Sequence, residues 1–155
     1  MRAPVLSVTR PWSTWLASGI KPIENRTWAT NYRSPLWIHA AKSWDDDAHD
    51  FAESIGGSLT DDQIMLLGWR GPHPDEYPTG ILALVDLASI CYARDADLAC
   101  TCGPWAIDDQ YHWRITNPRP LTEPIPARGR LGLWWPDPDL QAQLDPAHDL
   151  LSTKE

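Results

Sequence analysis

The chain has 155 residues and a mass of 17.5 kDa, the size of one ordinary domain. Hydrophobic residues make up 43% and charged residues 22%, which allows a packed core and excludes disorder of the whole chain. No apolar run approaches the roughly 18 residues of a membrane span, and no signal-peptide pattern opens the sequence. We therefore expect a soluble, cytoplasmic protein that does not bind membranes.

The charge is unevenly distributed. A net charge of −8 disfavours non-specific binding to nucleic acids. However, two tryptophan-rich segments are basic: residues 10–42 hold five basic and one acidic residue, and residues 111–135 hold four basic and one acidic. An acidic segment, residues 45–62, separates them. If the fold joins the two basic segments, they form one positive, aromatic-lined face; the alternative is that these arginines border an ordinary surface.

The first third of the chain predicts two strands and one short helix. Residues 4–8 read as a strand, and Pro11 then stands where a helix accepts proline, at its first position. The apolar spacing that follows predicts a two-turn helix ending at Gly19. Residues 21–28 are expected to be extended or looped, and residues 36–40 to form a buried strand.

Further helices are expected in the middle and at the end of the chain. Residues 45–55 have acidic side chains in their first turn, where the helix dipole favours them. Thr60 and Gln63 resemble a capping box that starts a second helix, which Gly68 closes. Residues 137–155 read as a weak helix and then a frayed acidic tail.

The strongest strand candidate is the continuous apolar run of residues 80–91. Residues 111–115 alternate like a strand, residues 118–129 are expected to turn, and residues 131–135 form a short closing strand. Unequal strands, short helices and many turns predict an α+β fold built on a small, mostly antiparallel β-barrel.

Three charged residues stand directly after the first predicted helix. In an extended segment Glu24 and Arg26 point to the same side, with Lys21 just before them. They can pair with each other or converge on a ligand. The alternative is a plain surface salt bridge at a helix-to-strand turn.

These residues resemble the signature of the ASCH domain (activating signal cointegrator homology), which reads G-x-K-x-x-E-x-R. The signature is matched in register at Gly19, Lys21, Glu24 and Arg26. Segments similar to the family also flank it, namely Leu6–Val8, Pro11-Trp12, Pro35–Lys42, the strand from Gly80, Tyr111–Trp113 and Gly132–Trp134. The resemblance predicts an ASCH domain over residues 1–136 with residues 137–155 as its tail.

The resemblance implies a PUA-like barrel with a cleft beside the first helix, suited to RNA, other single-stranded nucleic acid or a modified nucleobase. Cationic groups can contact phosphates or base acceptors, a carboxylate can accept from an exocyclic amine, and an indole can stack on a base. His39 is either a cleft residue or a structural histidine, and Lys42 either borders the cleft or ends its strand. The candidate ligand-binding residues are Lys21, Glu24, Arg26, Trp12, Trp28, His39, Arg128 and Arg130.

Two other functions remain open. One small bacterial subgroup of the family hydrolyses N4-acetylcytidine with a lysine, a threonine and a glutamate. Lys21 aligns with that lysine, but Glu24 occupies the threonine position, so Lys21 and Glu24 are catalytic candidates only if the chain is an amidohydrolase or a ribonuclease using the same cleft. The acidic net charge also fits a protein-interaction module, with no particular partner indicated.

The three cysteines are an odd number in a chain without a secretion signal, which predicts reduced thiols. Cys91, Cys100, Cys102 and His112 offer four soft ligands, but C-x-C is not the usual zinc-knuckle spacing. Spare thiols are the default interpretation, so neither a metal nor a cofactor is expected.

Overall fold

Six strands form one mixed sheet in the computed structural model, which describes residues 2–67, 74–92 and 100–153. The spatial order is β2-β5-β4-β3-β1-β6. Four of the five neighbouring pairs are antiparallel, and β1 with β3 is the parallel pair. The strands are β1 (Val5–Arg10), β2 (Ile23–Arg26), β3 (Ser34–Trp44), β4 (Gly80–Tyr92), β5 (Tyr111–Ile125) and β6 (Leu133–Trp134).

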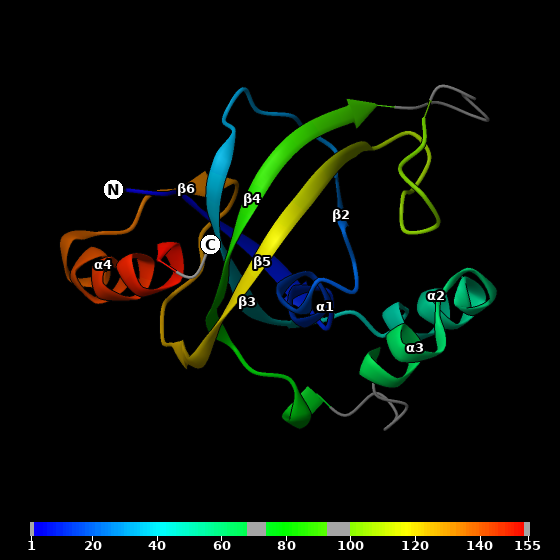
Figure 1. Cartoon of the computed structure of the whole chain (residues 1–155), viewed down its shortest axis with the longest axis horizontal. Coiled ribbons are helices and arrows are strands. Elements are labelled where there is room, and N and C mark those ends of the chain that lie inside the picture. Colours follow the sequence, from blue (N-terminus) through cyan, green and yellow to red (C-terminus); the bar gives the residue numbers. More distant parts are fainter. Residues whose placement is uncertain (1, 68–73, 93–99, 154–155) are drawn as a thin grey trace.

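The sheet is strongly curved but is not closed. Register shifts interrupt the β1–β3, β3–β4 and β4–β5 pairings, and such irregularities bend strands and increase their twist. Figure 1 shows β4 and β5 arching together over the first helix. Among the described residues, β2 and β6 remain the two edges. The predicted α+β class and mostly antiparallel pairing are confirmed, whereas a closed barrel is not.

Four α-helices accompany the sheet in the described part of the chain: α1 (Trp12–Ser18), α2 (Ala48–Ser54), α3 (Asp61–Leu67) and α4 (Pro138–Ser152). Short 3-10 turns cover Gly56–Ser58 and Pro74–Glu76. The predicted capping box is confirmed, because Thr60 and Gln63 exchange hydrogen bonds of 2.8 and 3.2 Å. The expected end at Gly68 lies outside the described residues. No described helix is both long and apolar enough to cross a membrane.

Strand β5 is longer than the sequence predicts. Residues 118–125 were expected to turn, yet β5 continues to Ile125 and pairs with β4 over this length. Edge strand β2 pairs only with residues 111–114 of β5. Beyond them, among the described residues, no strand takes up the other side of β5, so its prolines interrupt no second ladder.

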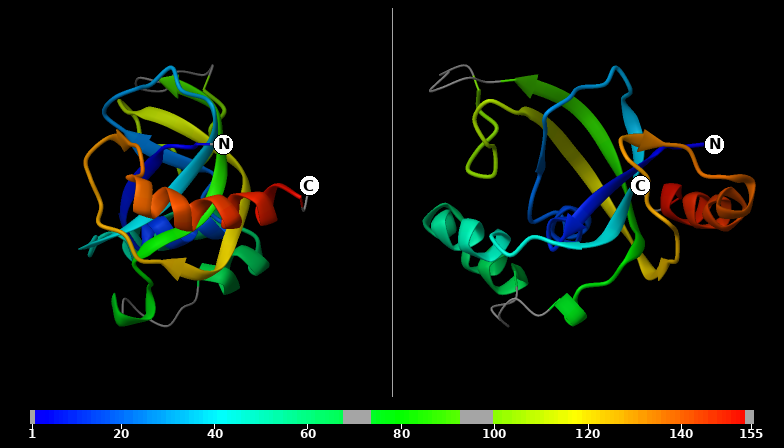
Figure 2. Two further views of the ribbon diagram at one scale, coloured as in Figure 1. Left: turned by 90° about the vertical axis from the view of Figure 1, so that its left-hand side faces the viewer. Right: turned by 180° about the vertical axis from the view of Figure 1, so that it is seen from behind.

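The two faces of the sheet carry separate cores. Figures 1 and 2 show α1 inside the curve of the sheet and α4 against the opposite face. On the inner face Leu16 of α1 packs with Ile38 and Trp113, and on the outer face Trp37 and Leu84 pack with α4. Because side chains alternate along β3, neighbours such as Trp37 and Ile38 serve different cores.

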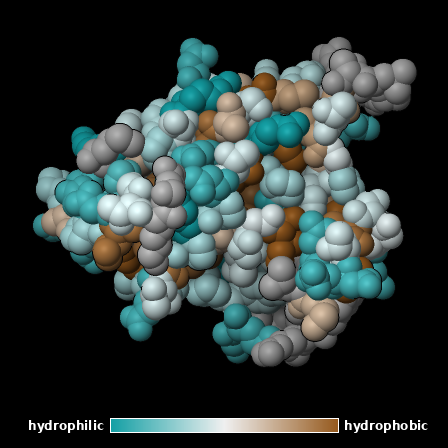
Figure 3. Space-filling view, in the orientation of Figure 1, coloured by the Kyte–Doolittle hydropathy of each residue, from teal (hydrophilic) through white to brown (hydrophobic). Residues whose placement is uncertain are grey.

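A third core joins the side of α1 to α2. Trp15, Ile23, Ala48 and Trp105 are buried in it. Trp15 and Trp37 are each about 1% exposed, so both are core residues and neither offers a surface for stacking. On the face drawn in Figure 3, the described hydrophobic residues form small separate patches between hydrophilic ones.

The C-terminal segment forms a firm 15-residue helix where a weak helix and a frayed tail were expected. The side chain of Asp137 accepts a 2.8 Å hydrogen bond from the Leu140 amide, and Pro138 occupies the first turn. Leu144 and Leu151 are buried against the outer core. Packing against the sheet thus stabilises a helix that has a weak pattern of its own.

Substituting Leu144 tests this docking. Leu144→Ala removes a fully buried side chain and is expected to lower the free energy of unfolding by about 2–5 kcal/mol. Leu150→Ala on the same helix is the control, because Leu150 is 66% exposed; its effect should stay within about 0.5 kcal/mol. Urea unfolding of both variants measures the difference. Equal effects would show that α4 does not contribute to the cooperative core.

Candidate functional site

The turn after α1 fixes where the ASCH-like signature lies. Gly19 ends α1 in the left-handed conformation, with φ of 84°. A Cβ at this position would lie 2.9 Å from Cγ of Pro118 on β5, so glycine is required both by conformation and by space. The chain then enters β2, where Ile23 pairs with Arg114 of β5. Helix α1 and edge strand β2 therefore hold the signature residues beside the sheet.

Lys21, Glu24 and Arg26 bind one another. Lys21 Nζ lies 3.1 Å from Glu24 Oε1, and Arg26 Nη2 lies 3.0 Å from Glu24 Oε2. The Asn25 amide also donates to Oε1, at 3.1 Å. The carboxylate thus accepts three hydrogen bonds and retains one acceptor position, on Oε2. Of the two arrangements left open by the sequence, the structure shows the pairing.

Arg26 also connects edge strand β2 with β1, which lies near the other edge of the sheet. Its Nη2 donates a 2.8 Å hydrogen bond to the carbonyl oxygen of Ser7 on β1. β2 lies at one edge of the sheet and β1 lies next to the other, so this side chain links elements that do not pair as strands. Arg26 Nε is buried and has no partner among the described residues. The guanidinium is therefore a structural link that also leaves one buried donor, Nε, without a partner among the described residues.

Burial and the neighbouring charges together shift the pKa values of Lys21 and Glu24. Lys21 is 3% and Glu24 6% exposed. Burial lowers the pKa of Lys21 below its ordinary value, although the Glu24 charge opposes this. Burial acts to raise the pKa of Glu24, but the charges of Lys21 and Arg26 outweigh it and hold this pKa below the ordinary value. Glu24 is therefore an ionised carboxylate at neutral pH.

One cleft is lined by Trp12 of α1 together with the ion triad, and we call it the helix cleft. It encloses about 660 Å³, and Trp12, Lys21, Glu24 and Arg26 line it. The Trp12 indole N–H donates to Asp45 Oδ2 at 2.8 Å, and Lys21 Nζ lies 5.1 Å from the centre of its ring. Acidic side chains of residues 45–47 form part of the rim. This cleft therefore combines an aromatic wall with charges of both signs.

A second and larger cleft, which we call the basic cleft, lies on the other side of Arg26. It encloses about 1100 Å³, and four cationic side chains line it: Arg26, Lys42, Arg128 and Arg130. No aspartate or glutamate is among its described lining residues. Arg26 and Ser7 belong to both clefts, so the two hollows adjoin at the ion triad. Cations of the two basic segments thus meet at this cleft, although no tryptophan is among its described lining residues.

His39 supports the wall of the basic cleft. Its Nε2–H donates to the Ala127 carbonyl oxygen at 2.8 Å, and its Nδ1 then accepts from the Ser7 hydroxyl at 3.0 Å. Burial lowers the pKa of His39, so the ring is neutral at pH 7. A Cβ on Gly129 would lie 2.7 Å from His39 Cε1, which shows how closely this segment approaches the ring. These contacts position the segment that carries Arg128 and Arg130.

The structure divides the candidate residues into two groups. Trp12, Lys21 and Glu24 line the helix cleft, while His39, Arg128 and Arg130 line the basic cleft. Arg26 belongs to both. Trp28 lines neither cleft; its ring packs edge-on against Trp113, with centroids 4.8 Å apart.

Strand β1 also contributes side chains to both clefts, and none of them is among the candidates named from the sequence. Ser7 and Thr9 line both clefts. Their spacing by two residues along a predicted strand was the available signal, because such residues face the same side. The spacing alone could not show that this side of β1 faces the two clefts.

Similarity to known proteins shows the family of this chain. The family described as "ASCH domain" matches residues 6–125. The chain therefore belongs to the ASCH domain family. Among its curated relatives are "Activating signal cointegrator 1" of Homo sapiens and of Mus musculus, each 28% identical over 130 residues. The match covers 83% of this chain and 21% of each relative, so the chain spans about a fifth of the length of these proteins.

Neutralising Glu24 should change how stability depends on pH. The folded-state pKa of Glu24 is below its ordinary value of 4.5, so its ion pairs stabilise the fold above that pH and are lost as the pH falls through the folded-state pKa. Glu24→Gln should cost about 3 kcal/mol or more at pH 7, because it leaves two cations without their partner. This loss should shrink in acid.

Denaturant unfolding between neutral and acidic pH measures this effect. Glu123→Gln makes the same chemical change at an exposed position and serves as control. If both variants keep the pH dependence of the original chain, the triad does not contribute to stability in the way described.

Proposed function

We propose that this ASCH domain binds single-stranded RNA, with the sugar-phosphate backbone in the basic cleft. The observation that carries the proposal is the charge of that cleft, which gathers four cations without an acidic group among its described lining residues. The chain as a whole has a net charge of −8, so this local field is opposite to the average. Phosphate groups are attracted by such a local positive surface. Interaction with RNA is also what membership of the ASCH family implies.

Single-stranded rather than double-stranded RNA fits the helix cleft. A splayed base can enter a hollow with an aromatic wall, and Trp12 provides that wall. Arg26 lies between the two clefts, where a backbone phosphate next to that base would lie. One nucleotide can thus occupy both clefts, with its phosphate on Arg26 and its base beside Trp12.

The remaining acceptor on Glu24 gives this base position a preference. Oε2 accepts from Arg26 and has one lone pair left, which suits an exocyclic amine such as that of cytosine. Lys21 donates a hydrogen bond to the carboxylate, and its ammonium group lies over the Trp12 ring. It therefore positions the two groups relative to each other. We therefore propose that the helix cleft favours a cytosine or a modified cytosine.

Removing single cations from the basic cleft should weaken RNA binding and its salt dependence. Arg128→Ser and Arg130→Ser should each lower affinity and reduce the slope of log affinity against log salt by about 0.7, the value for one phosphate contact on a single strand. Fluorescence anisotropy of a labelled cytosine-rich RNA over a salt series measures both quantities.

Arg33→Ser is the matched control, because Arg33 is exposed and lies outside both clefts. It changes the net charge equally but should leave the slope unchanged. Equal losses in all three variants would contradict a localised phosphate site, and absence of binding at low salt would remove the proposal. An oligonucleotide with uracil in place of cytosine tests the base preference separately.

A second candidate function is hydrolysis of an acylated cytidine, and the buried Lys21 favours it. A lysine acts as a base only when neutral, and burial lowers the pKa of this lysine. Mass spectrometry of N4-acetylcytidine incubated with the protein should then detect cytidine and acetate. Turnover should rise with pH and be lost in Lys21→Gln with the fold retained, as checked by circular dichroism. Absence of product from the unmodified chain removes this candidate.

A further inference from the structure

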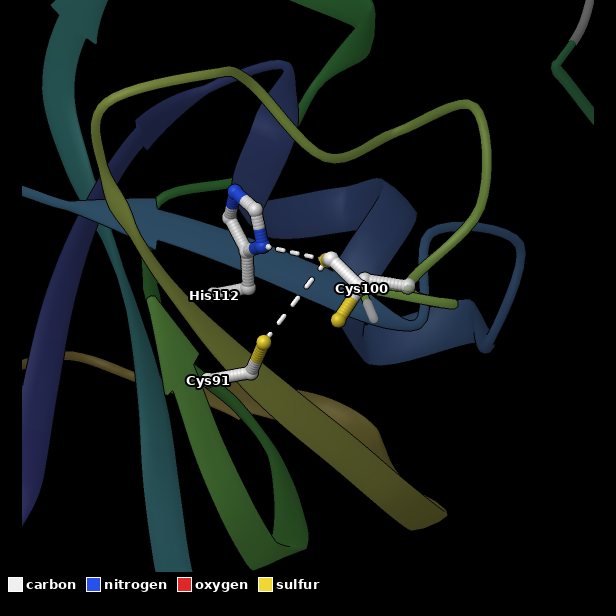
Figure 4. Close-up of side chains that lie close together, drawn as sticks. Cys91, Cys100 and His112 are labelled. Carbon is white, nitrogen blue, oxygen red and sulfur yellow. Dashed lines mark hydrogen bonds between the residues drawn. The ribbon is translucent and has the colours of Figure 1, made fainter. Parts of the chain in front are cut away.

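Three cysteines and one histidine meet at one end of the β4–β5 pair. Cys91 on β4 lies directly opposite His112 on β5 in the strand register. Cys100 and Cys102 belong to the segment that leads into β5. One ligand atom from each of the four lies within 4.8 Å of all the others. Figure 4 shows Cys91 and His112 pointing from neighbouring strands toward Cys100.

The spacing of these atoms is that of ligands around a metal ion. The Sγ atoms of Cys91 and Cys100 are 3.6 Å apart, and Cys100 Sγ is 3.4 Å from His112 Nδ1. A disulfide needs about 2.05 Å between sulfurs. Zinc with tetrahedral bonds of about 2.3 Å to sulfur and about 2.0 Å to nitrogen separates its ligand atoms by about 3.5–3.8 Å. The two distances of 3.6 and 3.4 Å lie close to the second arrangement, and the other pairs of ligand atoms lie within 4.8 Å.

Two contacts of neighbouring residues favour the binding of a cation by these side chains. His112 Nε2 donates a 2.6 Å hydrogen bond to the Ile107 carbonyl oxygen, so in the neutral ring Nδ1, which faces Cys100, is the nitrogen with the lone pair. Such a bond on the far nitrogen is typical of metal-binding histidines. Arg114 Nη2 lies 4.0 Å from Cys102 Sγ. Its positive charge offsets the single negative charge that a divalent zinc ion and three thiolates would leave.

We propose that Cys91, Cys100, Cys102 and His112 bind one zinc ion in a tetrahedral, structural site. Thiolate and imidazole groups are the ligands that zinc prefers, and four of them fill its coordination. A filled site holds structure and has no position for a substrate. Cys100 and Cys102 supply two of the ligands, and the other two, Cys91 and His112, come from paired strands. The site therefore differs from a zinc knuckle.

The site lies next to the wall of the helix cleft. Asn25, beside Glu24 on β2, donates to the Trp105 carbonyl oxygen at 2.9 Å and accepts from the Ile107 amide at 2.9 Å. Ile107 itself lines the helix cleft, and Trp105 packs near Trp12 with centroids 6.4 Å apart. A zinc ion would therefore fix residues 100–110 against β2. This role does not depend on whether the clefts bind RNA.

Metal analysis of the purified full chain tests the proposal. The protein is prepared with reduced thiols in the presence of zinc, dialysed, and measured by inductively coupled plasma mass spectrometry, with one zinc per chain expected. Replacement by cobalt should give the visible bands of a tetrahedral ion and the charge-transfer bands of thiolate ligands. Removal of zinc by a chelator should lower the melting temperature and speed amide exchange in residues 100–110, while β3 stays protected.

Variants assign the ligands. Cys91→Ser and His112→Gln should each lose most of the bound zinc and the tetrahedral cobalt spectrum, whereas His49→Gln, a histidine elsewhere in the chain, should keep both. If the original chain is folded and reduced but binds no stoichiometric metal, the proposal is overturned. This outcome does not depend on whether the variants fold. A cobalt spectrum without thiolate bands, or a disulfide among these cysteines in freshly purified protein, would overturn it as well.

Discussion

The buried Glu24 carboxylate, held between Lys21 and Arg26, is the interaction on which both clefts depend. Arg26 reaches from β2 to the Ser7 carbonyl on β1 and so connects the two sides of an open sheet. Without Glu24, two cations would lie together in a largely buried position. Water screens charges only weakly there, so no negative charge would offset their repulsion. The carboxylate thus permits the arginine to lie at the boundary between the helix cleft and the basic cleft.

An ion triad of this kind is a costly way to stabilise a small protein. Removing charges from water costs several kcal/mol per ion, and apolar groups of similar volume often stabilise a fold equally well. Here the hydrogen bonds among the described residues leave Glu24 with one acceptor position and Arg26 with one buried donor, Nε. This combination of burial and unused hydrogen-bonding capacity supports the proposed binding role of the triad.

Charge organisation in this chain is a property of the fold. The basic cleft collects Arg26 from β2, Lys42 from β3, and Arg128 and Arg130 from the segment after β5. His39 and Gly129 bring that last segment close to β1, through packing that allows no Cβ between them. The acidic residues 45–47 lie instead at the rim of the helix cleft. An acidic protein therefore presents one positive hollow, and its position follows from backbone packing.

Much of the fold followed from local sequence. The helix between Pro11 and Gly19, the capping box at Thr60 and Gln63, and the long strand from Gly80 each depend on neighbouring residues and were predicted correctly. Strand β5 beyond residue 118 and helix α4 were underestimated because prolines and a weak apolar pattern act against them locally. Pairing with β4 and burial of Leu144 decide in their favour, and neither partner is adjacent in sequence.

The candidate site divides in the same way. The sequence alone placed Lys21, Glu24 and Arg26 close to one another, because their spacing within one turn and strand follows from local geometry. Only the tertiary structure decided that Arg26 lines both clefts and contacts Ser7, that Trp28 packs on Trp113 instead of facing either cleft, and that Cys91 meets His112. Each of these contacts joins residues more than 18 positions apart in the chain. Strand pairing and core burial set such distances, and residue spacing does not encode them directly.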